Sequence, residues 1–515
     1  MTTGPRADRV VAALLAVCGL LLLWNLNNGL LWQDEAETAV LARNTLAFGY
    51  PRVSDGHNVI EIQPWLHHGP GQSWIYSPWL PFYLLAGVFA IVGESTWSAR
   101  LPFALAGWLS VYLAWRLVRL LTGDRTIQRL TVALLTCSVA FLVLMRQCRY
   151  YAVATALVLG ICLAYLRFLR GPTWLRAGLV GVLLVLLFHT NAATFLPLAA
   201  VIVAHQARFG TPMSRRRALV IGTVAAMLIL PVLPLFVQPG HAGVWTLGRV
   251  EDHFETYIRV LNKHVVPLAF MGVSTLALAV ASRRSRRSVL PPVPDRAAVA
   301  FLGLVAAAQL AFFVLVPDQR HLRYLAPIFP LLFIVEAWWL TACLRAHRLA
   351  GGIITALVLF TNVLQSPHVQ IPLGAFLTKL TVPYVGPMEG VVGYLRQHAR
   401  AGDTVKIPYD DRTLMFYTSV VVEPPSAFTQ ESYPEWVVIR RDWIPSEFFQ
   451  GEYFRKLNAT YERIELAAPD VQWQDREDVG QHQFRTVTDA PRIVIYRKRG
   501  AARGASQRMV RGGTA

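Results

Sequence analysis

The stretch VVAALLAVCGLLLLWNLNNGLLWQDEAE, residues 10–37, decides the fold. Residues 10–31 are almost wholly apolar, and a helix that spans a bilayer needs roughly 20 such residues. No small-residue cleavage site follows them, so this segment is interpreted as a retained helix rather than a signal peptide. Three carboxylates, Asp34, Glu35 and Glu37, come directly afterwards. The sequence therefore predicts a first membrane span that surfaces at an acidic segment.

The composition indicates a polytopic membrane protein whose partner is the lipid bilayer. Of the 515 residues, 54% are hydrophobic and 16% are charged, whereas about 25% are charged in soluble proteins. The net charge of +18 could indicate nucleic acid, but the arginines lie in short loops between apolar runs. That distribution follows the positive-inside bias of membrane proteins, so nucleic-acid binding is excluded. The five cysteines have no metal-ligand spacing.

About eleven transmembrane helices are predicted from the apolar runs. These are residues 10–31, 100–121, 130–145, 152–169, 174–188, 194–207, 217–237, 265–281, 297–316, 324–343 and 349–365. A further run, 78–92, is short and contains Pro78 and Pro81. The basic loops fall on one side only if 78–92 does not cross, so it is predicted to be interfacial or re-entrant.

This arrangement places the protein in the plasma (inner) membrane with a cytoplasmic N-terminus. The outward segments are 32–97, 146–151, 189–193, 238–264, 317–323 and everything after about residue 366. Their polar chemistry is unusual, whereas the cytoplasmic loops are merely basic, so a functional site is expected to face outward.

The predicted fold is mainly α, with a small α/β domain near the C-terminus. Residues 1–370 form the transmembrane module with its first outer loop, 32–97. Residues 380–498 combine a helix-like segment, MEGVVGYLRQHA, with strand-like runs, DTVKIPY, EWVVIRR and PRIVIYR, and are interpreted as an extracytoplasmic α/β domain. A turn is expected at Gly402. Residues 499–515, rich in Gly, Ala and Arg, are predicted to be a disordered basic tail.

Two interpretations of the acidic segment stay open together. Acidic residues stabilise the first turn of a helix, and Gly49 and Pro51 would end that helix well. A functional interpretation rests on position, because Asp34 lies beside Trp24 and Trp32 at the outer edge of the membrane. Partial desolvation there would raise its pKa, which suits a general base.

Cationic residues occur in the other outward loops, against the charge bias. The motifs are SARLP, MRQCRYYA and PDQRHLRYLAP. Helix-end arginines that reach for the interface are one explanation. The other is a phosphate-bearing ligand, because Arg binds phosphate with two parallel hydrogen bonds. The candidate phosphate-binding residues are Arg100, Arg146, Arg149, Tyr150, Arg320, Arg323 and Tyr324.

The first loop also offers weak metal ligands. His57, Glu61, His67 and His68 could bind a divalent metal, but their spacing matches no defined site. A loop folded on the membrane, with aromatic side chains at headgroup level, is the alternative. No cofactor is predicted with certainty.

In order along the chain, these motifs resemble a known family. An Asp-Glu pair after the first helix, then ARN, a Pro-containing segment, ARLP, RYYA and RYLAP, is similar to the GT-C glycosyltransferases. The protein O-mannosyltransferase and aminoarabinose-transferase branch is most similar, over roughly residues 10–365. Where the family often places a lysine beside the Pro-containing segment, this chain has Tyr76 and Ser77. Related aminoarabinose transferases also carry an Asp in the second outer loop, where this chain has RQCRYYA.

The resemblance implies a polyprenyl-phosphate sugar donor and an acceptor on the outer face. It implies Asp34 as catalytic base with Glu35 in support. For the donor phosphate it implies Arg100 and, near RYLAP, one arginine or tyrosine, which is Arg320, Arg323 or Tyr324.

The leading hypothesis is an integral-membrane, inverting glycosyltransferase. A base would deprotonate an acceptor hydroxyl while cations stabilise the departing phosphate, and direct displacement inverts the anomeric centre. The acceptor could be a lipid, a glycan or a protein. Two alternatives are a flippase or transporter of lipid-linked sugars and a non-catalytic assembly subunit. A transporter would need charged or broken helices within the membrane, whereas the charges of this sequence collect at the outer edge.

Overall fold

The structure is a computed structural model that describes residues 8–61, 68–236, 246–285, 290–291, 295–316, 320–366, 370–429, 432–472 and 482–500. The predicted tail, 499–515, lies outside these residues except for Arg499 and Gly500. The chain divides into two compact units. Unit 1 comprises residues 1–27, 74–382 and 476–484, and unit 2 comprises residues 28–73, 383–475 and 485–515.

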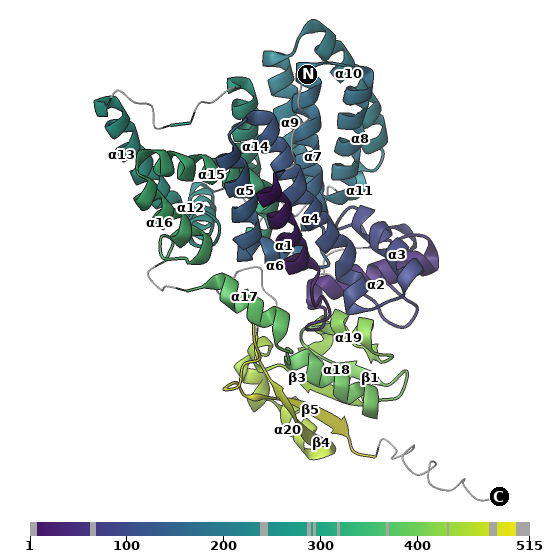
Figure 1. Cartoon of the computed structure of the whole chain (residues 1–515). Coiled ribbons are helices and arrows are strands. Elements are labelled where there is room, and N and C mark those ends of the chain that lie inside the picture. Colours follow the sequence, from purple (N-terminus) through teal and green to yellow (C-terminus); the bar gives the residue numbers. More distant parts are fainter. Residues whose placement is uncertain are drawn as a thin grey trace, which may run out of the picture. The chain divides into compact units, whose positions relative to one another are not determined.

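The regular elements in the described part of unit 1 are all helices (Figure 1). Its helices are α1 (Arg9–Leu23), α3 (Leu80–Val92), α4 (Thr96–Leu121), α5 (Arg125–Cys137), α6 (Val139–Arg146), α7 (Tyr151–Arg170), α8 (Trp174–Thr190), α9 (Ala192–Phe209), α10 (Pro212–Ile229), α11 (Leu233–Phe236), α12 (Leu247–His264), α13 (Leu268–Ser285), α14 (Arg296–Leu315), the 3-10 helix η2 (Leu322–Ile328), α15 (Phe329–Ala346), α16 (Arg348–Phe360) and α17 (Pro372–Thr381).

Five of the described helices are long and apolar enough to cross a membrane, or up to seven if each of two bent pairs is one span. Four shorter apolar helices, α1, α3, α8 and α16, accompany them. A mainly helical protein with several apolar helices is therefore confirmed. The number of eleven spans stays a prediction, as does the path of 78–92, which forms α3.

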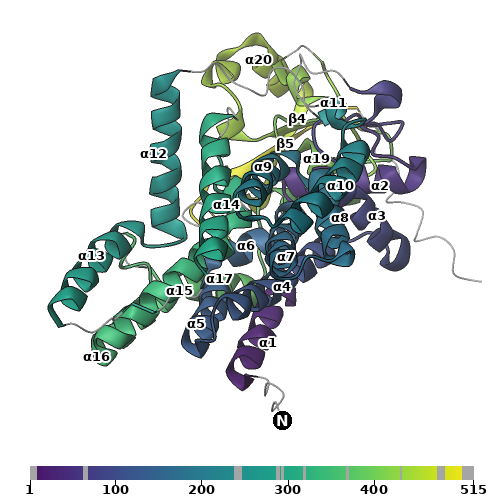
Figure 2. The ribbon, with the colours of Figure 1, turned by 90° about the horizontal axis from the view of Figure 1, so that it is seen from above.

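The bent pairs are a feature that sequence analysis did not expect. The predicted span 130–145 is two helices, because α5 and α6 meet at Ser138 with a bend of 63°. α12 and α13 meet at a bend of 79°, which Figure 2 shows from above. Ser138 both ends α5 and caps α6, since its hydroxyl accepts a hydrogen bond from the Phe141 amide at 3.4 Å. Sequence analysis also did not single out Glu336, a charged residue that lies in α15, within a candidate membrane span.

Close packing at small residues holds the helices of unit 1 together. α4 contacts α7, α6 and α1, and α7 continues to α8. At Gly107 of α4, an added Cβ would stand 2.6 Å from Cβ of Met145 on α6, closer than side chains approach. Small residues at helix crossings let membrane helices approach and gain van der Waals contact. Gly107 therefore fixes the distance between α4 and α6.

Unit 2 is built on a five-stranded sheet of order β2-β1-β3-β5-β4. Its strands are β1 (Thr404–Lys406), β2 (Val421–Val422), β3 (Trp436–Ile439), β4 (Tyr461–Pro469) and β5 (Arg492–Lys498). β1 pairs in parallel with β2 and β3, whereas β5 lies antiparallel between β3 and β4. The helices of this unit are α2 (Gln33–Phe48), η1 (Pro70–Gln72), α18 (Pro387–His398), α19 (Asp411–Tyr417), η3 (Pro425–Thr429), η4 (Arg441–Trp443), η5 (Ser446–Gln450) and α20 (Glu452–Thr460).

The predicted elements of the C-terminal region are confirmed. The helix-like segment forms α18, and the three strand-like runs form β1, β3 and β5. Gly402 has φ +86°, a left-handed conformation that glycine adopts without steric cost, as the predicted turn requires. Strands β2 and β4 were not predicted, because VV is too short for a pattern and YERIELAAP alternates irregularly.

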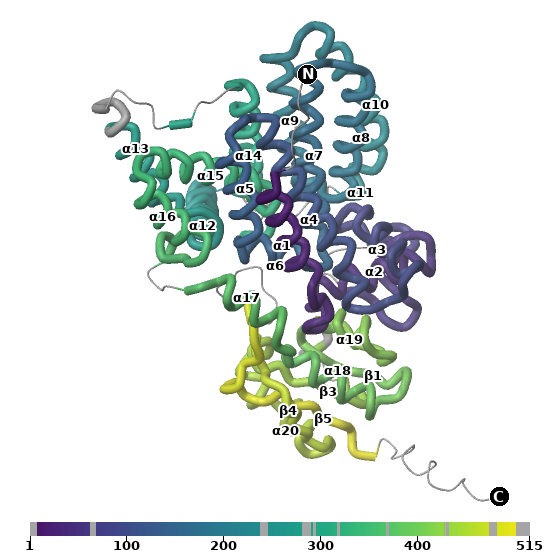
Figure 3. Tube along the Cα trace, in the orientation of Figure 1, coloured from purple at the N-terminus to yellow at the C-terminus, as the bar shows by residue number. Residues whose placement is uncertain are grey.

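Residues 32–73 of the predicted first outer loop are grouped with this sheet rather than with the helices of unit 1. Residues 28–73 belong to unit 2, and α2 contacts α19 within it (Figure 3). Asn58 pairs with the edge of the sheet, because its amide donates to the Val420 carbonyl at 3.2 Å and accepts from the Val422 amide at 2.7 Å. The acidic segment is thus held by residues from the other end of the chain.

Candidate active site

The acidic segment forms the first turn of α2, as the capping interpretation predicts. Asp34 and Glu35 lie in this turn, and the helix ends at Gly49, whose φ is +82°. Negative side chains at this end complement the helix dipole. The stop at Gly49 is therefore confirmed, and capping accounts for part of the acidic composition.

Burial distinguishes the three carboxylates of α2. Glu35 is 0% exposed and Glu37 is 7% exposed, whereas Asp34 is half-buried. A catalytic base has to reach a substrate proton, within hydrogen-bonding distance or through one water. Of the three, Asp34 is the one whose side chain retains access to its surroundings.

Arg412 of α19 is the cation that faces these carboxylates. Its Nη1 forms an ion pair with Glu37 Oε2 at 2.6 Å, and its Nη2 donates to the Glu61 carbonyl at 2.9 Å. Burial by itself would lower the pKa of Arg412, but the carboxylates of Glu37, Asp411 and Asp34 outweigh burial and raise it. Arg412 therefore carries a permanent positive charge in the electrostatic field of Asp34.

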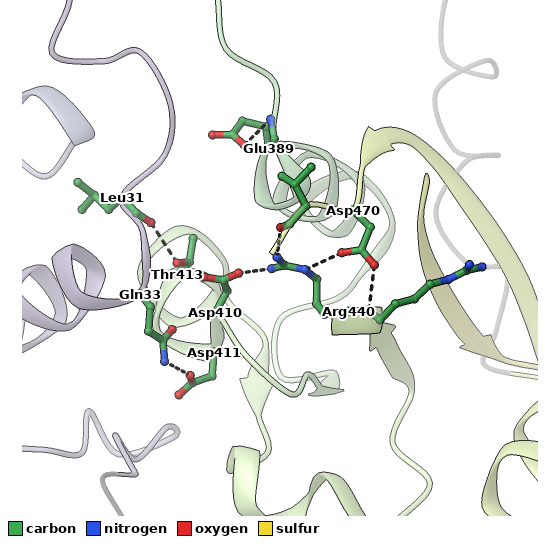
Figure 4. A network of polar contacts seen from close by, with 11 residues as sticks. Leu31, Gln33, Glu389, Asp410, Asp411, Thr413, Arg440 and Asp470 are labelled. Atoms are coloured by element: carbon green, nitrogen blue, oxygen red, sulfur yellow. Dashed lines mark hydrogen bonds and ion pairs between the residues drawn. The ribbon is translucent and has the colours of Figure 1, made fainter. Parts of the chain in front are cut away.

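The start of α19 is tied to the start of α2 by side chains that lie close together in Figure 4. The Gln33 amide donates to Asp411 Oδ1 at 2.5 Å, and the Thr413 hydroxyl donates to the Leu31 carbonyl at 3.0 Å. One residue earlier, the Leu30 amide donates to Glu389 Oε1 at 2.7 Å. These bonds fix the backbone that leads into Asp34.

Behind α19, a buried ion-pair network anchors the helix to the sheet. Arg440, which follows β3 and is 1% exposed, donates to Asp410 and to Asp470, the latter at 3.0 Å (Figure 4). Asp410 precedes α19 with φ +68°, a conformation that residues other than glycine rarely adopt. The ion pairs hold this unfavourable conformation and so set the position of Asp411 and Arg412.

Arg43 completes the attachment from the other end of α2. Its guanidinium donates to the carbonyls of Met415 at 3.1 Å and Phe416 at 2.8 Å, near the end of α19. It also lies 4.6 Å from the centre of the Phe416 ring. The arginine of the ARN motif therefore stabilises the pairing of α2 with α19.

Four of the predicted phosphate-binding residues form one cluster in unit 1. Arg149 lies over the Tyr150 ring and Arg323 over the Tyr324 ring, each at 5.8 Å. Burial raises the pKa of Tyr150, Tyr324 adds to this effect, and the charges of Arg149 and Arg323 oppose it. The loop after α6 and the η2 segment thus bring two arginines and two tyrosines together.

The other three predicted arginines have structural partners. Arg146 donates to the carbonyls of Leu21 at 2.7 Å and Leu22 at 2.9 Å, which cap the end of α1. Arg100 donates to the Leu26 carbonyl at 3.0 Å. Last carbonyls of a helix need such donors, so both arginines stabilise the exit from α1.

Arg320 forms an ion pair with Asp252 of α12 and a weaker hydrogen bond of 3.4 Å with Thr256. Sequence analysis did not identify Asp252 as a partner of Arg320. Its carboxylate neutralises part of the positive charge that made Arg320 a candidate phosphate-binding residue.

The weak metal candidates do not form a metal site among the described residues. No group of three or more His, Cys, Asp or Glu side chains there is arranged to hold an ion. The Glu61 carboxylate instead accepts hydrogen bonds from the amide and the hydroxyl of Ser426. His57 is exposed and His68 is half-buried, and His67 lies outside the described residues.

Sequence reasoning missed Arg412, Asp411 and Gln33. Their signal is the run YDDRT, residues 409–413, in which two carboxylates and an arginine open a helix. The run lies far from α2 in the sequence, so only the fold shows that it faces the acidic segment.

Comparison with known proteins supports the resemblance of the motifs. Residues 76–235 match the family described as dolichyl-phosphate-mannose-protein mannosyltransferase. No curated protein sequence matches the chain. The structure is similar to that of ArnT from Cupriavidus metallidurans bound to undecaprenyl phosphate, with a TM-score of 0.55 and 15% identity over 95% of this chain and 97% of ArnT. Against the apo state of ArnT the TM-score is 0.58, with the same identity and coverage.

At this identity the ArnT likeness shows a shared fold, and the family match covers the segment from α3 to α11. Together they confirm that this membrane protein resembles the GT-C glycosyltransferases in fold and, over residues 76–235, the mannosyltransferase family in sequence.

Proposed function

We propose that the protein is an inverting glycosyltransferase that moves a sugar from a polyprenyl-phosphate donor to an acceptor hydroxyl on the outer face of the membrane. The observation that carries the proposal is the half-buried Asp34, which is followed in α2 by the buried Glu35 and the ion-paired Glu37. The ArnT complex with undecaprenyl phosphate supports the choice of donor class.

In the proposed reaction Asp34 accepts the proton of the acceptor hydroxyl. The hydroxyl oxygen then forms a bond to the anomeric carbon while the bond from that carbon to the phosphate oxygen breaks. The polyprenyl phosphate leaves with both bonding electrons, and attack from the opposite side inverts the anomeric centre. No soluble nucleotide sugar takes part.

The cluster of Arg149, Tyr150, Arg323 and Tyr324 is proposed to stabilise the departing phosphate. Arginine offers two parallel donors to phosphate, and charge that develops on a leaving group is best stabilised by donors already in place. Arg320 and Arg100 are proposed to add positive potential. Glu35, which is fully buried, is assigned to positioning α2 rather than to proton transfer.

The roles of Asp34 and its neighbours are separable by substitution. Asp34→Asn should lower kcat by about 10²–10⁴-fold, because a general base contributes about that much. Its affinity for undecaprenyl phosphate, used as the donor probe, should stay unchanged. The matched variant Glu35→Gln alters a carboxylate of the same helix turn and should reduce transfer less. Full transfer by a folded Asp34→Asn protein would exclude Asp34 as the base.

The phosphate cluster is tested by binding. Arg149→Ala and Arg323→Ala should each weaken undecaprenyl phosphate binding by about tenfold or more, since a hydrogen bond to a charged group contributes about 1.5–3 kcal/mol. Arg259→Ala removes an exposed arginine that pairs with Glu255, and it serves as control. Unchanged binding in both cluster variants would remove this role.

Transport of lipid-linked sugar is the second candidate, favoured by the bent pairs α5–α6 and α12–α13. Purified protein offered a panel of polyprenyl-phosphate-linked mannose, arabinose and aminoarabinose, with lipid, glycan and protein acceptors, separates the two functions. A transferase yields glycosylated acceptor in detergent, whereas a transporter moves donor across vesicles without forming product.

A further inference from the structure

A cavity of about 210 Å³ lies within unit 1, where the two bent helix pairs have their breaks. Ser138, between α5 and α6, lines one side, and Lys263 at the end of α12 lines another. Residues of α15, of the end of α16 and of the start of α17 also line the cavity. Broken membrane helices tolerate their interrupted backbone where it lines a cavity, and such cavities bind polar ligands in other membrane proteins.

Glu336 of α15 lines this cavity and is 1% exposed. Among the described residues, neither of its carboxyl oxygens has a hydrogen-bond partner. A buried carboxyl group without partners is costly, and within a membrane protein such a group is usually functional. A cationic group that also donates hydrogen bonds, such as a primary ammonium, would satisfy it.

The opposite charge stands at the accessible part of the same cavity. Lys263 lies in the last turn of α12 and is exposed, whereas Glu336 is enclosed. A ligand that satisfies both therefore carries a positive group at its inner end and a negative group at its outer end. Phe333, Phe360 and Leu373 add apolar side chains to the lining of the cavity.

We propose that this cavity binds a zwitterionic amino-phosphate headgroup, with its ammonium on Glu336 and its phosphate at Lys263. The cavity volume is many times the roughly 10–15 Å³ that a single water needs, so the cavity has room for a group of several heavy atoms. The bilayer around the spans supplies phosphatidylethanolamine as the source, and soluble phosphoethanolamine carries the same chemistry. The residues that line this cavity include neither Asp34 nor any member of the arginine–tyrosine cluster. The proposal therefore does not depend on the transferase function.

The test titrates the full-length protein in detergent with phosphatidylethanolamine, phosphatidylcholine and phosphatidylglycerol, and counts retained lipids by native mass spectrometry. Phosphatidylethanolamine should bind at least about tenfold tighter than phosphatidylcholine, whose quaternary ammonium donates no N–H bond. Glu336→Gln should abolish this preference. Glu255→Gln, at an exposed carboxylate paired with Arg259, should preserve it.

If Glu336→Gln does not fold, Lys263→Ala still tests the proposal, because Lys263 is exposed and its substitution should not disturb folding. It should weaken binding of phosphatidylethanolamine while the protein keeps its unfolding temperature. Competition by soluble phosphoethanolamine at matched concentration would assign the site to the free headgroup, and no competition would assign it to the lipid. Equal binding of both zwitterionic lipids by the wild type, or an unchanged preference in a folded Glu336→Gln protein, overturns the proposal.

Discussion

Arg412 and Glu37 form an ion pair of 2.6 Å that joins α19 to α2 within unit 2. The side chains are 13% and 10% exposed, so the pair is largely removed from water. Breaking a buried ion pair leaves the remaining charge without compensation, whereas an exposed pair contributes little.

Arg412→Gln should therefore destabilise unit 2 by about 3–5 kcal/mol. The measurement is the unfolding free energy in detergent, with hydrogen exchange of α2 amides as the local probe. Arg463→Gln, which breaks the exposed pair with Glu465, is the control and should cost about 0–1 kcal/mol. Equal losses in the two variants would show that the α2–α19 pair is not buried in solution.

Asp410 combines an ion pair with a left-handed backbone. Asp410→Ala loses both the carboxylate and the polar side chain that tolerates this conformation, whereas Asp410→Asn loses only the charge. We expect the Ala variant to be less stable than the Asn variant by about 1–2 kcal/mol, measured by thermal unfolding. Equal stability of the two would contradict the strained conformation at residue 410.

Gly49 offers a matched pair of glycine substitutions. An added Cβ meets nothing within 4 Å at Gly49 or at Gly393 inside α18, so sterics with neighbours cancel. Gly49→Ala should destabilise by about 1–2 kcal/mol, because φ is +82° there. Gly393→Ala should stabilise by roughly 0.5–1 kcal/mol through helix propensity. The measurement is the unfolding temperature, which should fall in Gly49→Ala and rise in Gly393→Ala. A change of the same sign in both variants would contradict the left-handed conformation at Gly49.

Glu435 gives the sheet of unit 2 a pH dependence. The Thr404 hydroxyl and amide donate to its carboxylate, and these bonds lower the pKa of Glu435 below its ordinary value of 4.5. A depressed carboxyl pKa means that its contribution to stability is present above pH 4.5 and is lost as the pH falls through the folded-state pKa.

Hydrogen exchange of β1 and β3 should therefore accelerate below about pH 4.5, beyond the intrinsic change in exchange rate. Thr404→Val removes the hydroxyl donor and should flatten this acid dependence. Thr460→Val, whose hydroxyl donates only to a helix carbonyl, should leave it unchanged. A flat profile in the wild type would rule out the effect of Glu435.

Local signals predicted much of the fold. The apolar runs indicated a protein with several apolar helices, Gly49 marked the end of α2, and strand-like runs located β1, β3 and β5. These features depend on a few neighbouring residues, so a single sequence carries them. The break at Ser138 escaped detection because it lies inside a single apolar run, and hydropathy does not report a bend.

The candidate site was only partly predictable for a related reason. Asp34 was selected by its position, but its electrostatic partner Arg412 lies near the other end of the chain. Arg146 and Arg149 were both predicted to bind phosphate, because both depart from the positive-inside bias. In the structure Arg146 caps α1, whereas Arg149 lies in a cluster with tyrosines. Distinguishing them requires the hydrogen-bond partners that only tertiary structure provides.

The discontinuity of unit 2 has a consequence for biosynthesis. The ribosome completes α2 early, and every described helix from α3 to α17 follows before α19 exists. Glu37 cannot meet Arg412 until translation of the chain is nearly finished. The acidic helix therefore acquires its folded surroundings last, and a chain truncated before residue 411 would insert its spans without assembling the segment that holds Asp34.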